Sequence, residues 1–157
     1  DVCSSDLVKI LACDRVDYSD FYRQFPNVEK VDADELWARS EVLTIHLSKN
    51  RSTIGMYSAD VQKKLKPGVV LVNCARGQMF DEAALAENLK SGHIGAAAFD
   101  VFAVEPANDN PLVHLPNMYA SPHIGATPLG SWEAMLRSGI HGIEHAYEPR
   151  PGEYPFD

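Results

Sequence analysis

The sequence is poor in the features that mark secreted, membrane-spanning and disulfide-stabilised proteins. Its 157 residues include three cysteines, Cys3, Cys13 and Cys74, an odd number without C-x-x-C spacing. This pattern argues against both a disulfide framework and a structural zinc site. No apolar run approaches the roughly 20 residues that span a bilayer, and no secretory signal opens the chain. We therefore expect a cytoplasmic protein without a membrane partner and without a metal.

Positive charge is also scarce. Lys and Arg number 14 against 22 Asp and Glu, which gives a formal net charge of −8. Such a chain repels the phosphates of nucleic acids, so a nucleic-acid partner is not expected. With 45% hydrophobic residues, the chain suits one globular domain with its own core.

What the chain does have is a regular alternation of short runs rich in Val, Ile and Leu with helical patterns. This alternation is typical of an α/β protein in which helices cover both faces of a parallel sheet. The expected strands are residues 8–14, 28–32, 42–47, 69–73, 96–102 and 118–120. The expected helices are residues 34–39, a stretch that Ser58 caps and Pro67 ends, residues 81–91, and residues 129–147. The third has the clearest ends, because Asp81 suits an N-cap and Gly92 a left-handed stop.

In a sheet of this kind, ligands bind beyond the carboxyl ends of the strands, so the residues that follow each strand are the first candidates for function. Asp14 ends the first strand, where a carboxylate can bind the ribose hydroxyls of NAD or simply cap a turn. Both interpretations stay open, and Arg15 beside it weakens the preference for NAD over NADP. His46, Leu47 and Ser48 follow the third strand and face the same crevice.

The fourth strand leads into Cys74, Ala75, Arg76 and Gly77. The small residues here would let a flat ligand approach the backbone. Arg76 is either a surface charge or a planar fork that binds the carboxylate of a 2-oxo or 2-hydroxy acid through two hydrogen bonds.

Glu105 and His123 follow the fifth and sixth strands, so they converge at one edge of the sheet. A lone histidine near a turn is more often structural than catalytic. A hydride that enters or leaves a carbon, however, requires a proton to move on the neighbouring oxygen, and histidine is suited to that transfer. A carboxylate beside it favours the imidazolium and fixes the tautomer, so Glu105 would assist without reacting.

Four sequence blocks in this order resemble the D-isomer-specific 2-hydroxyacid dehydrogenases, the family of D-3-phosphoglycerate, glycerate and formate dehydrogenases. The blocks are LKPGVVLVNCARG at residues 65–77, DEAALAENLKSGHIGAAAFDVF at residues 81–102, the pair Glu105-Pro106, and SPHIGAT at residues 121–127. The resemblance extends from about residue 8 to residue 127.

The resemblance implies an oxidoreductase that transfers a hydride between NAD and a D-2-hydroxy acid, with a Rossmann-like sheet. Arg76 would anchor the substrate carboxylate, His123 would exchange the proton, and Glu105 would be its partner. Asp100 would face the nicotinamide amide. The complete enzyme would be a homodimer whose substrate is a small 2-hydroxy or 2-oxo acid. The residues expected to bind NAD are Asp14, His46, Leu47, Ser48, Cys74, Ala75, Arg76, Asp100, His123, Gly125 and Ala126.

The chain departs from the family at its start. No G-x-G-x-x-G spacing occurs in it, so the turn that holds the pyrophosphate is absent, as are the first strand and most of the substrate domain. We expect a sheet incomplete at its N-terminal edge and a fragment that is inactive alone. Residues 1–7 would be a truncated start, residues 8–128 a partial NAD-binding domain, and residues 129–157 a helix and tail that return to the substrate domain.

Two other functions remain open. His141, Glu144 and His145 match the H-x-x-E-H pattern of a zinc hydrolase, although Gly142 weakens the helix that would carry the ligands. The chain could also be a non-catalytic module for NAD binding or dimerisation.

Overall fold

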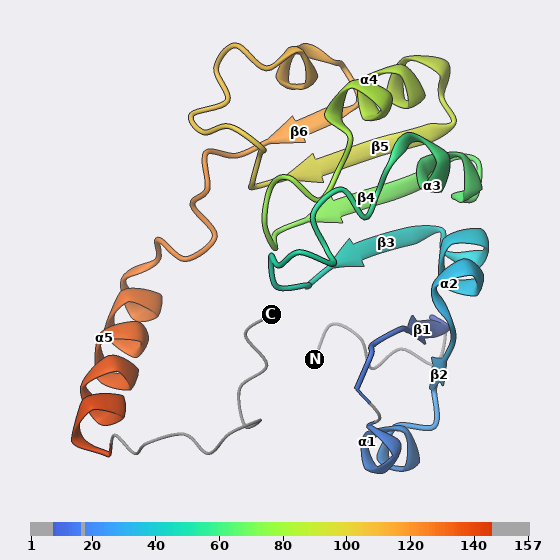
Figure 1. The fold of residues 1–157 in the computed structure, drawn as a ribbon. Coiled ribbons are helices and arrows are strands. Elements are labelled where there is room, and N and C mark those ends of the chain that lie inside the picture. Colours follow the sequence, from blue (N-terminus) through green and yellow to red (C-terminus); the bar gives the residue numbers. More distant parts are fainter. Residues whose placement is uncertain (1–7, 17, 146–157) are drawn as a thin grey trace.

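The structure is a computed structural model that describes residues 8–16 and 18–145. Strands and helices alternate along it, as the sequence predicts (Figure 1). In chain order the elements are β1 (Ile10–Ala12), α1 (Ser19–Gln24), β2 (Val28–Lys30), α2 (Ala33–Arg39), β3 (Val42–Ile45), α3 (Ala59–Lys64), β4 (Val69–Asn73), α4 (Glu82–Ser91), β5 (Ile94–Phe99), the 3₁₀ helix η1 (Pro111–His114), β6 (Met118–Ala120) and α5 (Leu129–Glu144).

All strand pairs are parallel, and they form two sheets instead of one. β1 pairs with β2, and a second sheet has the order β3-β4-β5-β6. In the doubly wound order 3-2-1-4-5-6, the first strand stands between the second and the fourth. We expected a sheet incomplete at its N-terminal edge, but the gap instead falls inside the strand order. It lies between β1 and β3, where the described residues provide no hydrogen-bonded strand.

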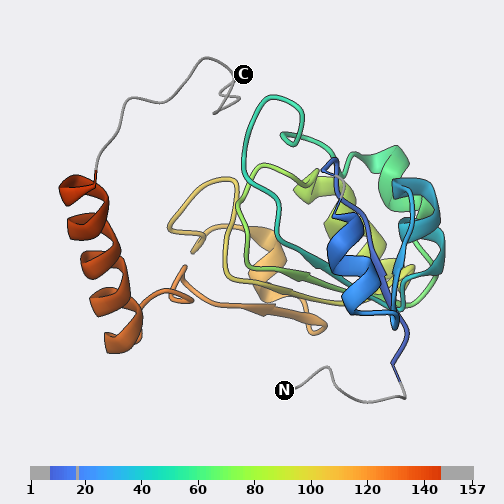
Figure 2. The same cartoon turned by 90° about the horizontal axis from the view of Figure 1, so that it is seen from below.

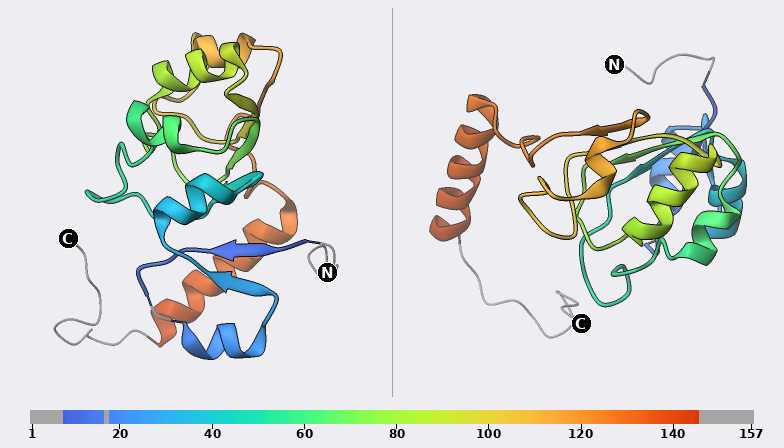
Figure 3. Two further views of the ribbon diagram at one scale, coloured as in Figure 1. Left: turned by 90° about the vertical axis from the view of Figure 1, so that its right-hand side faces the viewer. Right: turned by 90° about the horizontal axis from the view of Figure 1, so that it is seen from above.

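The core lies between the four-stranded sheet and the helices on one of its faces. Leu71 on β4, Leu85 on α4 and Ile94 on β5 are fully buried there. α3 and α4 lie side by side against this face (Figure 3). We expected helices on both faces, but side chains on the other face stay half-buried or exposed, and Val42 and Tyr119 are the clearest examples.

The α5 helix stands apart from this core (Figures 1 and 2). It confirms the predicted helix from residue 129, although it ends at Glu144, and Tyr147 lies outside the described residues. From Gly130 onward, its large apolar side chains are exposed. They are Trp132, Met135, Leu136, Ile140 and Ile143.

The predicted helix ends are confirmed where local chemistry decides them. The Asp81 side chain accepts a hydrogen bond from the Ala84 amide, and Gly92 has a φ of 77° at the end of α4. Ser58 caps α3 in the same manner by accepting from the Val61 amide. The strands β4 and β6 have their predicted bounds, whereas β1, β2 and β3 are shorter and β5 is shifted toward the N-terminus.

Candidate functional site

The candidate site is built from the loops that follow β4, β5 and β6. These strands are parallel neighbours, so their carboxyl ends lie at one edge of the sheet (Figure 1). The loop after β4 carries Arg76, the loop after β5 carries Glu105, and the loop after β6 carries His123. The predicted convergence at one edge is therefore present in the fold.

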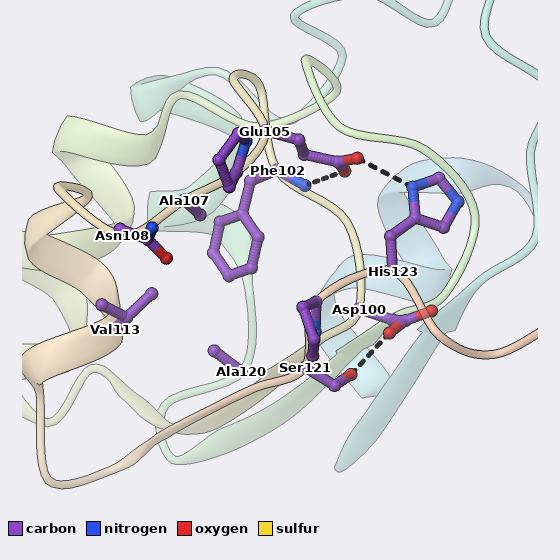
Figure 4. Close-up of a pocket in the computed structure, with 11 residues that line it drawn as sticks. Asp100, Phe102, Glu105, Ala107, Asn108, Val113, Ala120, Ser121 and His123 are labelled. Carbon is purple, nitrogen blue, oxygen red and sulfur yellow. Dashed lines mark hydrogen bonds and ion pairs between the residues drawn. The ribbon is translucent and has the colours of Figure 1, made fainter. Parts of the chain in front are cut away.

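Glu105 and His123 are in direct contact. The Nδ1 atom of His123 lies 2.8 Å from Oε2 of Glu105, and Oε1 of Glu105 accepts a hydrogen bond from the Phe102 amide at 3.0 Å. The hydrogen bond from His123, followed by that from Phe102, holds the pKa of Glu105 below its usual value. The second nitrogen of the His123 ring points away from Glu105 (Figure 4), and His123 is exposed. This ring can therefore exchange a proton on one side while a carboxylate holds it on the other.

Gly77 fixes the distance between the loop of Arg76 and the loop of Glu105. A Cβ atom at this position would lie 1.8 Å from the carbonyl oxygen of Phe102, so only glycine fits. The sequence suggested that small residues here admit a flat ligand. At Gly77 the close neighbour is instead the backbone that leads to Glu105.

Arg76 is exposed, and its guanidinium has no acidic partner among residues 8–16 and 18–145. Its Nη1 atom donates to the carbonyl oxygen of Ala75 at 2.6 Å. The buried side chain of Asn73 holds the turn, because its oxygen accepts from the Ala75 amide and its nitrogen donates to the carbonyl oxygen of Arg76. Sequence reasoning missed this role of Asn73, although an asparagine at a strand end that precedes a tight turn is a recognisable signal.

Asp100 is buried directly after β5 and lies beside the loop of His123. It accepts hydrogen bonds from the Ser121 hydroxyl and from the amides of Ile124 and Gly125. The sequence placed Asp100 and Gly125 in the NAD site, and the structure brings them together with His123. Ala126, the next residue of the predicted set, is exposed in the same loop.

Asp14 lies at the carboxyl end of β1, in the other sheet. It is exposed, and its Oδ1 atom accepts a hydrogen bond from the Val16 amide at 2.9 Å. The carboxylate therefore caps a turn. Asp14 is separated in the fold from the cluster of Arg76, Glu105 and His123 by the break between β1 and β3.

The remaining predicted residues lie after β3 and β4. His46 is exposed and shares a hydrogen bond with Thr44, Leu47 is half-buried against the core, and the Ser48 carbonyl oxygen accepts from the Thr53 hydroxyl. Cys74 is exposed and Ala75 is buried.

A cavity of about 470 Å³ lies beside the Glu105–His123 pair. Its wall is mostly apolar and includes Phe102, Ala107, Val113 and Ala120 (Figure 4). Both Glu105 and His123 also line this cavity.

The zinc pattern on α5 does not form a metal cluster. Within the described residues, no three His, Cys, Asp or Glu side chains are grouped as ligands. His141 and His145 stack with ring centroids 4.1 Å apart, and Nδ1 of His145 contacts the carbonyl oxygen of His141. Across the same residues, no helix is long and apolar enough to cross a membrane.

Residues 3–125 match the family described as "D-isomer specific 2-hydroxyacid dehydrogenase, NAD binding domain". The chain belongs to this family. It is 40% identical over 127 residues to a D-3-phosphoglycerate dehydrogenase of Mycobacterium leprae, an alignment that covers 81% of the chain and 24% of that relative. The chain thus spans about a quarter of the length of this relative.

Solved structures show the same fold. A D-isomer specific 2-hydroxyacid dehydrogenase of Lactobacillus delbrueckii ssp. bulgaricus, in its NAD complexed form, superposes with a TM-score of 0.77 at 25% identity, covering 91% of this chain and 47% of that one. A member from Xanthobacter autotrophicus, in complex with NADPH and MES, has a TM-score of 0.72 at 28% identity, covering 89% and 58%. The chain therefore has the Rossmann-like fold of this NAD-binding domain family, and relatives in complex with NAD and with NADPH both occur among the solved structures.

Proposed function

We propose that this chain belongs to an enzyme that interconverts a D-2-hydroxy acid and a 2-oxo acid with NAD, and that it carries the catalytic groups. The observation that carries the proposal is the His123–Glu105 contact of 2.8 Å, at the sheet edge where Arg76 also lies. A histidine and a carboxylate in contact, next to a loop with an unpaired arginine, form the set that hydride transfer to a 2-oxo acid requires.

The geometry of the His123–Glu105 pair suggests how the proton would move. When bound, NADH would supply a hydride for the carbonyl carbon of the 2-oxo acid. The protonated ring of His123 would donate a proton to the carbonyl oxygen from the nitrogen that faces away from Glu105. Oxidation of the alcohol reverses both transfers, so His123 then accepts the proton. Glu105 holds the ring in one tautomer and favours its charged form during reduction.

Arg76 would bind the substrate. Its guanidinium offers a planar fork that matches a carboxylate, and it has no acidic partner in the described part of the chain. Two parallel hydrogen bonds to the substrate carboxylate would orient the carbonyl toward His123. The choice among 2-oxo acids would come mainly from the substrate domain.

The chain has residues that could bind the nicotinamide of NAD, but it lacks the glycine turn that would bind the pyrophosphate. Among the described residues, Oδ2 of Asp100 accepts from the Gly125 amide alone, so it could also accept from the nicotinamide amide. The Asp14 carboxylate, at the end of β1, could accept from the adenosine ribose. No G-x-G-x-x-G turn is present to hold the pyrophosphate. We therefore expect the chain alone to bind NAD weakly and to be inactive, and the complete enzyme to be a homodimer.

The experiment is a steady-state assay of the complete enzyme that contains this chain, with NADH and a panel of 2-oxo acids. At least one 2-oxo acid should be reduced to the D-hydroxy acid. Arg76→Ala should lower kcat/KM for it by about 10- to 100-fold, the effect of losing charged hydrogen bonds. Arg23→Ala, on α1, is the matched control and should behave as wild type. Unchanged substrate kinetics in Arg76→Ala would mean that Arg76 is a surface charge.

A further inference from the structure

The backbone of His123 has a conformation that contacts with other residues must stabilise. Its φ angle is 56°, in the left-handed region that residues other than glycine rarely adopt. A residue persists there only when its surroundings hold it. The loop of residues 121–127 belongs to no helix or strand, so regular backbone pairing does not supply that support.

The carboxylate of Asp100 makes three contacts with this loop, in addition to the backbone hydrogen bonds from Ser121 to Phe99 and from Thr127 to Ile124. Oδ1 accepts from the Ser121 hydroxyl at 2.6 Å and from the Ile124 amide at 2.9 Å, and Oδ2 accepts from the Gly125 amide at 2.9 Å. The donors lie on both sides of His123 along the chain, and the contact with Ser121 is visible in Figure 4. Asp100 therefore joins the end of β5 to the loop that follows β6.

The carboxylate is charged as it does so. Burial alone would raise the pKa of Asp100, but the hydrogen bonds from Ser121 and the two loop amides, together with the nearby His123, hold this pKa below its usual value. A charged acceptor forms stronger hydrogen bonds than a neutral one. The negative charge of Asp100 also acts on Glu105, where it opposes the lowering of the pKa by His123 and Phe102.

Gly125 allows the close approach. A Cβ atom at this position would lie 3.0 Å from Oδ2 of Asp100, so a larger residue would press on the carboxylate. Glycine is therefore the residue that best allows the amide of residue 125 to lie 2.9 Å from Oδ2 of Asp100.

We propose that Asp100 is the positioning residue of His123. Its carboxylate binds the amides of Ile124 and Gly125 and so fixes the left-handed turn that presents the His123 ring to Glu105 and to the substrate. The catalytic meaning of this arrangement rests on the proposed function. The contacts themselves need no cofactor, because all of them form within the chain, and they come in addition to any contact of Asp100 with the nicotinamide amide.

Hydrogen–deuterium exchange, measured by mass spectrometry on the cofactor-free protein, tests the contact. Ile124 and Gly125 are exposed residues, yet their amides should exchange at least about tenfold more slowly than free amides. Asp100→Asn has one acceptor oxygen in place of two, so this protection should fall. Ser121→Ala is the matched control, because it leaves both amides bound. Gly125→Ala disturbs the contact with Asp100 intact and should also lower the protection.

Kinetics of the complete enzyme test the consequence for His123. In Asp100→Asn, kcat for 2-oxo acid reduction at saturating NADH should fall by about 10- to 100-fold, the size expected for lost hydrogen bonds to a charged group. Asp109→Asn, at an exposed acid outside this loop, is the control and should behave as wild type. A rise in the Kd of NADH with kcat unchanged would show that Asp100 only binds cofactor, and would overturn the proposal.

The two proposals fail in different ways. A wild-type enzyme that reduces no 2-oxo acid would contradict the proposed function and leave the exchange result standing. Fast exchange of the Ile124 and Gly125 amides in the wild type would contradict the positioning role of Asp100, whatever the activity.

Discussion

The part of the chain from β3 to β6 and the elements on either side of it differ in how completely they are packed. Residues 42–120 contain almost all of the buried hydrophobic cluster, whereas α1 buries no residue and the large apolar side chains of α5 are exposed. Arg76, Asp100, Glu105 and His123 lie on or next to the packed part. Asp14 lies on the less packed side, beyond the break between β1 and β3.

The difference separates two tasks of a dehydrogenase. In the proposed function, proton transfer and carboxylate binding would depend on a few side chains of the packed part. Binding of the adenosine and the pyrophosphate would depend on β1 and on a glycine turn, and the sequence has Asp14 here but no G-x-G-x-x-G. The proposal therefore assigns this chain more of the groups for the chemistry than for the cofactor.

Of the substitutions that test this comparison, removal of His123 should lower turnover the most. In the complete enzyme, His123→Ala should lower turnover in both directions by about 10²- to 10⁴-fold, because it removes the group that exchanges the proton. The Kd of NADH should change little. His114→Ala, at the end of η1, is the control and should keep normal turnover. A matching loss in both variants, or a loss of NADH binding in His123→Ala, would contradict the assignment.

Paired leucine substitutions test the difference in packing. Leu71 on β4 is fully buried and Leu136 on α5 is exposed. Leu71→Ala should lower the free energy of unfolding of this chain by about 2–5 kcal/mol because it leaves a cavity, and Leu136→Ala should change it by less than about 0.5 kcal/mol. Urea unfolding followed by circular dichroism measures both.

The same leucine pair shows whether α5 has a partner. In the complete enzyme, Leu136→Ala should become clearly destabilising if the substrate domain covers α5, as we propose for residues 129–157. An effect as small as in the isolated chain would mean that this face stays in solvent there.

Substitution of Asp14 should have a smaller effect, limited to the preference between NAD and NADP. The wild-type enzyme should prefer NAD because the carboxylate binds the ribose hydroxyls and repels the phosphate of NADP. Asp14→Ala should reduce this preference by about tenfold, the loss of one charged hydrogen bond, and leave KM for the 2-oxo acid unchanged. The ratio of kcat/KM for NADH and NADPH is the measurement. Equal ratios in wild type and variant would mean that Asp14 only caps its turn.

Local sequence signals predicted the parts of the fold that local chemistry decides. Asp81 and Gly92 bound α4 because a side-chain acceptor and a left-handed residue are sufficient to start and stop a helix. The β4 strand was predicted at its observed bounds, because it is an apolar run between a Pro-Gly turn and a polar strand end. Patterns of this kind need no knowledge of distant residues.

The remaining features depend on contacts between distant segments. The sequence pattern of α5 predicts a helix but not that its apolar face lies exposed. The need for glycine at residue 77 arises from Phe102, which is 25 residues away and meets it only in the fold. Asp100 was predicted as a cofactor residue, and its hydrogen bonds to the loop of His123 became visible only with β5 and β6 side by side.

The pH profile of 2-oxo acid reduction, in the complete enzyme and its Glu105→Gln variant, tests the central claim most directly. The hydrogen bond from His123, and then that from Phe102, holds the pKa of Glu105 below its usual value, so Glu105 is a carboxylate wherever a histidine titrates. Reduction needs protonated His123, and the carboxylate favours that form. Activity should therefore decline on the alkaline side at a lower pH in Glu105→Gln than in the wild type, with residual activity retained. Superimposable profiles from two folded proteins would contradict the account.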